Sequence, residues 1–157
     1  MTLVLLNRHS SSRLHPTYSV SRAKKKRTRG LTLTSVALPT EVRSPYATYG
    51  TQFGVVQRPT HRNTLQDQAK FEACAHGFTD FSEANYGVAM ISRDKYGSTV
   101  EGNTMRLSLL RAPTSPDPET DQGEHRISFG ILPHTGSFGQ SGVYLEAMKF
   151  NNAPYGK

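Results

Sequence analysis

The fold class follows from residues 31–38, Leu-Thr-Leu-Thr-Ser-Val-Ala-Leu, in which apolar and polar side chains alternate with a period close to two. This alternation is typical of a strand with one buried face, and Pro39 predicts where the strand ends. Similar short runs recur along the chain, separated by residues that favour turns. The sequence therefore predicts a mainly β protein, built as a partial antiparallel β-sandwich.

The other expected elements are short. A hairpin turn is predicted at residues 94–97, and loops are predicted at residues 112–123 and 133–139. No stretch keeps a 3.6-residue apolar period over several turns, although residues 64–70 have room for one helical turn or two. The further strands that we expect lie at residues 46–53, 71–76, 86–91, 99–100, 105–110, 125–132 and 143–150.

The positive charge is concentrated at one end of the chain. Residues 1–30 hold eight Lys and Arg and no acid, whereas the remaining residues carry eleven bases against twelve acids. Because residues 1–30 have little apolar surface to bury, we expect a basic, disordered segment there and one incomplete sandwich domain at residues 31–157. The basic run at residues 24–29 lacks interleaved aromatic residues, so a nucleic-acid partner is not expected.

Cysteine usage and hydropathy bear on the compartment. Cys74 is the single cysteine, which rules out an intramolecular disulfide and favours a reducing compartment. We predict a buried, inert thiol beside His76, two residues along the same strand. The opening apolar run at residues 3–6 is shorter than a signal-peptide core, and nothing is long enough to span a membrane. We therefore expect a soluble chain that is not secreted through a signal peptide and has no membrane partner.

Acidic and histidine residues show no complete metal site. The six histidines form no HExxH motif and no tight cluster with Asp. Asp117, Glu119 and Asp121 alternate as the first ligands of an EF-hand do, but Gln122 stands where that loop needs Gly, and Ser128 where it needs Glu. We therefore expect neither a metal ion nor another cofactor within this chain.

Hydrolysis of a glycoside generally requires two carboxyl groups on opposite sides of the sugar. Asp80 and Glu83 form one candidate pair, which we interpret as turn caps. Four acids at residues 117–124 form a second group, which we interpret as solvated because the surrounding loop is rich in Pro. No residue of this chain is assigned a catalytic role.

An ordered series of motifs begins at residue 42. It includes Arg-Ser-Pro-Tyr-Ala-Thr-Tyr at 43–49, Gln-Phe-Gly-Val-Val-Gln-Arg-Pro-Thr-His at 52–61, Asp-Lys-Tyr-Gly at 94–97 and Pro-His-Thr-Gly at 133–136. In this order the motifs resemble the C-terminal half of family 38 α-mannosidases of the cytosolic and vacuolar type. The resemblance covers roughly residues 31–154 and does not extend to residues 1–30.

The resemblance implies a parent enzyme that releases α-linked mannose from oligosaccharides. In that family an N-terminal α/β barrel holds a zinc ion, an Asp nucleophile and a second carboxylic acid. None of the barrel motifs is found in this sequence, so the chain is expected to be a non-catalytic C-terminal β-domain whose partners are the barrel region and, through the parent enzyme, a mannose-containing oligosaccharide. A truncated gene, a mis-predicted start and a separated fragment all remain open.

A free-standing carbohydrate-binding module is the alternative. It is supported by five polar or aromatic residues that could contact a sugar, although core tyrosines and turn aspartates would explain the same residues. These candidate substrate-binding residues are His76, Asp80, Tyr86, Asp94 and Tyr96.

Overall fold

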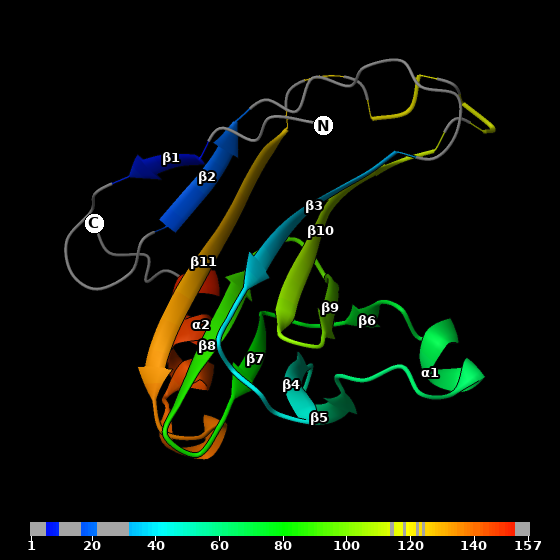
Figure 1. The fold of residues 1–157 in the computed structure, drawn as a ribbon. Helices are drawn as coiled ribbons and strands as arrows, with labels where there is room; N and C mark the ends of the chain where they lie inside the picture. Colours follow the sequence, from blue (N-terminus) through cyan, green and yellow to red (C-terminus); the bar gives the residue numbers. More distant parts are fainter. Residues whose placement is uncertain are drawn as a thin grey trace.

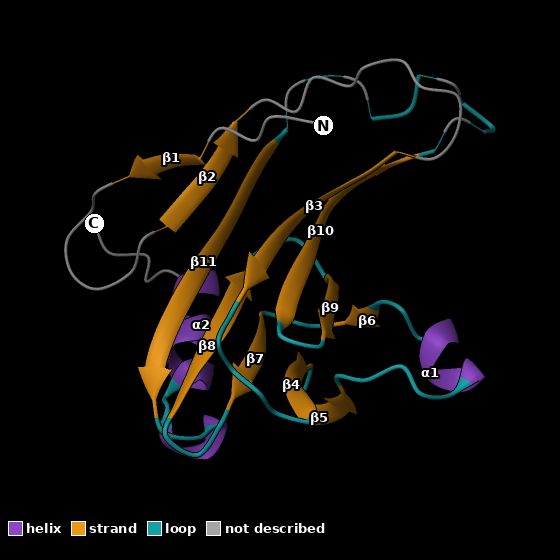
Figure 2. Ribbon diagram, in the orientation of Figure 1, coloured by secondary structure: helices purple, strands orange, loops and turns teal. Residues whose placement is uncertain are grey.

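The computed structural model describes residues 6–9, 17–21, 32–113, 115–117, 119–121, 123 and 125–152. Within these residues the chain forms two antiparallel sheets (Figures 1 and 2), which confirms the predicted mainly β sandwich. The larger sheet has the order β1 (Leu6–His9), β2 (Thr17–Ser21), β11 (Arg126–Thr135), β8 (Tyr86–Ser92), β7 (Phe78–Ser82), β4 (Tyr46–Thr51) and β5 (Gly54–Pro59). The smaller sheet has the order β3 (Thr32–Pro39), β10 (Thr104–Ala112), β9 (Gly97–Glu101) and β6 (Ala73–Cys74).

Two apolar layers cover the two faces of the seven-stranded sheet. The main core lies between the sheets and includes Phe81, Met105 and Phe129, each almost fully buried. A second cluster lies on the opposite face, where helix α2 (Val143–Asn151) packs on β7 and β8 through Val143 and Ala147. Because side chains alternate along a strand, β7 sends Phe81 into the first layer and its neighbours Phe78 and Asp80 toward the second.

Most of the predicted strands are present. The alternating run gives β3, which includes Pro39. Strands β8, β9 and β10 cover the runs expected at residues 86–91, 99–100 and 105–110, and β11 covers the run expected at 125–132 except for its first residue. The short helix α1 (Leu65–Ala69) confirms the one or two helical turns expected within residues 64–70. It begins at Thr64, whose hydroxyl accepts the backbone N–H of Asp67 while the Asp67 carboxylate accepts that of Thr64.

The strand predicted at residues 143–150 is wrong, because this segment is the helix α2. Val143 and Ala147 are buried and Phe150 packs beside them, so the contacting residues recur at helical spacing. Apolar residues also lie on the exposed side of this helix, where Tyr144 and Leu145 are more than half exposed. They obscured the 3.6-residue apolar period in the sequence.

Other boundaries also differ from expectation. Residues 52–53 form a turn, after which β5 continues as a strand that was not predicted. The run at residues 71–76 is reduced to the two-residue strand β6, and β7 lies where only turn caps were expected. Strand β11 extends through Thr135, so the predicted loop begins later, and a 3-10 turn, η1 (Phe138–Gln140), leads into α2.

Strands β1 and β2 lie inside the segment for which we predicted disorder. They pair with each other, and β2 pairs with β11 from Arg126↔Ser21 to Gly130↔Thr17. The rest of residues 1–30 lies outside the described residues. No helix in the described ranges is long and apolar enough to cross a membrane.

Candidate functional site

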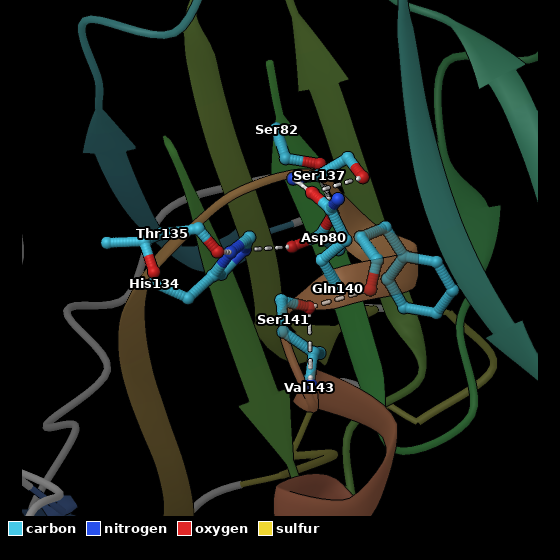
Figure 3. A network of polar contacts seen from close by, with 9 residues as sticks. Asp80, Ser82, His134, Thr135, Ser137, Gln140, Ser141 and Val143 are labelled. Atoms are coloured by element: carbon cyan, nitrogen blue, oxygen red, sulfur yellow. Dashed lines mark hydrogen bonds and ion pairs between the residues drawn. The ribbon is translucent and has the colours of Figure 1, made fainter. Parts of the chain in front are cut away.

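A buried acid–histidine pair lies on the helix-covered face of the seven-stranded sheet. Asp80 is fully buried at the middle of β7, and the side chain of His134, on β11, is 5% exposed. The Nε2 atom of His134 lies 2.7 Å from Asp80 Oδ1, and the hydroxyl of Ser82 donates to Asp80 Oδ2 at 2.7 Å. Figure 3 shows the imidazole pointing directly at the carboxyl group. Both carboxyl oxygens therefore have a partner.

Strand β8 separates the two partners, and a glycine makes their contact possible. Gly87 pairs with Ser82 on one side and with His134 on the other. A Cβ atom at Gly87 would lie 2.3 Å from Ser82 Cβ and 2.6 Å from His134 Cε1, which is far inside van der Waals contact. Because Gly87 has no side chain, the imidazole can lie across β8 and reach Asp80 on the third strand.

Burial determines the electrostatics of this pair. Loss of solvent raises the pKa of Asp80 above the ordinary aspartate value, while the hydrogen bonds to Ser82 and His134 and the charge of His134 act in the opposite direction. The pKa of Asp80 is raised overall, because the effect of desolvation is larger than that of the hydrogen bonds. A carboxyl group with such surroundings holds its proton to higher pH than one in water.

The loop after β11 closes over the same region. The backbone N–H of Gly136, which has a φ of 75°, donates to Asn85 O at 2.8 Å. The side-chain oxygen of Gln140 accepts from the backbone N–H and hydroxyl of Ser137. Figure 3 shows Ser137 and Gln140 beside the Asp80–His134 pair, in the segment that leads into α2. The exposed edge of His134 lines an open hollow, together with Tyr86 and Gln140.

This geometry favours a structural role for the pair. Asp80 has no exposed surface, and Ser82 and His134 occupy both of its carboxyl oxygens. Glu83, the other acid of the predicted turn, lies after β7 and accepts the backbone N–H of Arg43. The interpretation of Asp80 as a turn cap is wrong, because Asp80 lies within a central strand and binds a residue 54 positions away.

The five predicted sugar-contacting residues occupy different places. The rings of His76 and Tyr96 are in contact, with centroids 5.1 Å apart, and both line a hollow of about 270 Å³ beside α2. Tyr86 borders the hollow at His134, and Asp80 is buried beneath it. Asp94 is exposed in the turn between β8 and β9. No observation tests a sugar contact at any of the five, which stay predictions.

Cys74 is exposed rather than buried, so the predicted buried thiol is a further error. Its sulfur lies 3.5 Å from His76 Nε2, and this does confirm the expected adjacency.

Sequence reasoning missed His134 as the partner of Asp80. The available signals were Gly87 and the Pro-His-Thr-Gly motif, but neither indicates which strands are neighbours in the sheet. Among the described residues, no group of three or more His, Cys, Asp or Glu side chains could hold a metal ion.

Comparison with known proteins gives consistent matches. Residues 8–119 match the family model described as "Glycosyl hydrolases family 38 C-terminal domain". Alpha-mannosidase 2C1 of Mus musculus is 47% identical over 116 residues, which is 74% of this chain and 11% of that protein. Alpha-mannosidase of Saccharomyces cerevisiae is 48% identical over 116 residues, which again is 74% of this chain and 11% of that protein. The chain thus spans about a tenth of the length of these curated relatives.

Solved structures agree at the level of the fold. An alpha-mannosidase from Enterococcus faecalis V583 superposes with a TM-score of 0.72 at 17% identity, covering 87% of this chain and 16% of that chain. A second Enterococcus faecalis protein, of glycosyl hydrolase family 38, gives 0.68 at 17% identity, covering 86% of this chain and 16% of that one. The family match begins at residue 8, so the view that residues 1–30 do not resemble the family is wrong from that residue onward.

Proposed function

Since the chain belongs to the C-terminal domain family of the glycosyl hydrolases of family 38, we propose that it serves as the non-catalytic C-terminal β-domain of an α-mannosidase. The observation that carries this proposal is the identity of close to half over 116 residues to two proteins named alpha-mannosidase. The parent enzyme would release α-linked mannose from oligosaccharides, in the cytoplasm or the vacuole.

In this proposal the domain packs on the barrel region and helps to shape its sugar cleft. The outer face of α2 supports such packing, because Tyr144, Leu145 and Met148 are each about half exposed. Clustered apolar side chains on a surface commonly mark an interface. In the family that the sequence resembles, the barrel region holds the zinc ion and both catalytic carboxyl groups, so we expect the same of the parent enzyme.

The test combines activity with association. We expect the full chain, with added zinc, to release no mannose from an aryl α-mannoside. When the barrel region of the parent enzyme is supplied as a separate polypeptide, we expect the two to cosediment and the chain to melt at a higher temperature. Zinc-dependent hydrolysis by this chain alone would contradict the proposal.

A pair of variants tests the packing face. Met148→Glu places a charge on the outer face of α2 and should abolish cosedimentation with the barrel region. Ala84→Glu adds the same charge at an exposed position between β7 and β8 and should leave cosedimentation intact. If both variants cosediment equally well with the barrel region, α2 is not the packing face.

A second candidate function is sugar binding at the hollow beside α2. The His76–Tyr96 contact supplies aromatic surface, and Asn151 Oδ1, which lines the same hollow, is buried without a hydrogen-bond partner among the described residues. Titration with methyl α-mannoside should then shift the resonances of both rings in the wild-type chain. Tyr96→Ala should remove the shifts, whereas Tyr46→Ala, at an equally exposed tyrosine elsewhere, should keep them.

A further inference from the structure

A small cavity lies where the open edges of the two sheets meet. Strand β5 is the edge of the seven-stranded sheet, β6 is the edge of the four-stranded sheet, and the segment containing α1 connects these strands (Figure 1). The cavity has a volume of about 190 Å³ and is bordered by residues of β4, β5, β6 and β9 and of the α1 segment. Pockets for drug-sized molecules usually measure about 300–1,000 Å³. This cavity is therefore suited to a small chemical group.

A partly buried arginine borders the cavity. Arg58 pairs with Ala47 across β4 and β5, and Tyr49 pairs with Val56, so these four residues share the inner face of the sheet. The Nε atom of Arg58 is buried and has no hydrogen-bond partner among the described residues. Buried N–H groups are almost always paired in folded proteins, so this donor calls for an acceptor.

Tyr49 supplies a second polar group at the same cavity. Its hydroxyl accepts the backbone N–H of Val100 at 3.1 Å, and the ring is buried. A phenol that accepts one hydrogen bond still has its own proton to donate. Burial raises the pKa of Tyr49, while the Val100 hydrogen bond and the nearby charge of Arg58 act in the opposite direction. Tyr49 is therefore a neutral donor that lies within electrostatic reach of the guanidinium.

The charges around the cavity favour one further anion. Arg58, Arg62 and Lys70 border it. Glu101 binds Arg62 at 3.2 Å. Asp67 also borders the cavity, and hydrogen bonding to the side chain and backbone of Thr64 lowers its pKa, so that it is ionised at neutral pH. Two acids thus offset two of the three cations, and a single negative charge would complete the balance.

Arg58 could also protect the edge of the sheet. Inward-pointing charges on edge strands prevent two sheets from pairing edge to edge, and β5 is such an edge. That role requires only the charge. Edge protection explains neither the cavity beside the Arg58 guanidinium nor the Tyr49 hydroxyl at the same cavity.

We propose that this cavity is a binding site for a single carboxylate group, held by the guanidinium of Arg58 and the hydroxyl of Tyr49. The planar fork of a guanidinium matches a carboxylate, and such charge-assisted hydrogen bonds are stronger than neutral ones. The carboxylate belongs either to a small organic acid or to an Asp or Glu side chain of another polypeptide segment.

The first test is a titration of the full, isotope-labelled chain with sodium acetate, exchanged against sodium chloride at constant ionic strength. Saturable shifts of the Arg58 Nε–H and Val100 N–H resonances are expected. Arg58→Gln should weaken acetate binding by about tenfold or more, as loss of a charge-assisted contact predicts. Arg111→Gln removes the same charge from an exposed position on β10 and should bind acetate as the wild type does.

A third variant separates the site from edge protection. Arg58→Lys keeps the charge but loses the fork, so it should bind acetate more weakly than the wild type. It also keeps the test informative if Arg58→Gln fails to fold, as judged from the dispersion of its amide spectrum. Shifts that do not saturate, or that are the same in the wild type, Arg58→Lys and Arg111→Gln, would overturn the proposal and leave Arg58 as a protective edge charge.

The source of the carboxylate is decided by a second pair of probes. A blocked Gly-Glu-Gly tripeptide is compared with its Gly-Gln-Gly counterpart in the same titration. Binding of the Glu peptide that is clearly tighter than that of acetate assigns the site to a protein side chain, and equal binding assigns it to a small acid. Equal shifts with the Glu and Gln peptides would show that the carboxylate is not recognised and would refute the site.

Discussion

Asp80 and Arg58 lie on opposite faces of the seven-stranded sheet and differ in whether their buried polar atoms have hydrogen-bond partners. On the helix-covered face, Asp80 has a partner at each carboxyl oxygen, and its partner His134 is almost fully enclosed. On the face toward the smaller sheet, the Nε atom of Arg58 is buried beside a cavity and has no partner among the described residues. A satisfied pair contributes to the fold, whereas an unsatisfied donor is available to a ligand. Loss of the satisfied pair should therefore destabilise the fold more than loss of Arg58.

Removing His134 should have the largest effect. In His134→Ala, Asp80 loses the partner of one carboxyl oxygen while it stays buried, and leaving a buried polar group unsatisfied costs about 1–3 kcal/mol, and more where that group is charged. Urea unfolding followed by circular dichroism measures the change. The double variant Asp80→Asn/His134→Ala should recover part of the loss, because no buried charge then remains. A loss below that of an ordinary surface substitution would show that the pair does not stabilise the fold.

Gly87→Ala should come next. The new methyl group would overlap Ser82 Cβ and the ring of His134, and overpacking of this kind typically costs about 1–3 kcal/mol. Gly139→Ala is the matched control, since a Cβ atom there meets nothing within 4 Å. Its unfolding midpoint should stay unchanged or rise slightly. Equal midpoints for the two variants would refute the close crossing of His134 over β8.

The pH dependence of the pair should be smaller and has a definite sign. The pKa of folded Asp80 is raised above the unfolded value near 3.8, so the folded state binds the proton more tightly. The contribution of Asp80 to stability is therefore greatest at low pH, and it falls as pH rises from the unfolded pKa through the folded one, by up to about 1.4 kcal/mol per pH unit. Relative to Asp80→Asn, the wild type should lose stability across this acidic window. An opposite slope would contradict a raised pKa.

Arg58→Gln should have the smallest effect on stability. Because Arg58 Nε makes no hydrogen bond to the described residues, its replacement should change the free energy of unfolding by no more than about 0.5 kcal/mol. Urea unfolding of the variant beside His134→Ala gives the contrast directly. A loss comparable to that of His134→Ala would mean that Arg58 is a structural residue after all.

Sequence patterns were informative where one face of a strand is buried. The alternation at residues 31–38 gave β3, and the β-branched and apolar run in β8 gave a central strand. They failed at β7, because Thr-Asp-Phe-Ser carries polar side chains on both faces of a strand that is nonetheless buried. They also failed at α2, where exposed Tyr144 and Leu145 mask the helical spacing of Val143 and Ala147.

The candidate sites depend on strand neighbours that no local pattern specifies. His134 was recognised only as part of a motif, and its bond to Asp80 exists because β11 and β7 lie on either side of β8 at Gly87. Arg58 appeared within another motif, and only the position of β5 at the sheet edge turns its side chain toward a cavity.

The sequence alone therefore determined the β class, the family and the basic character of residues 1–30, because alternation, motif order and charge are all local properties of the chain. Only the tertiary structure decided which polar groups are satisfied and which are not. Hydrogen bonding of a buried group depends on side chains that are distant in sequence, and sheet order and register bring those side chains together.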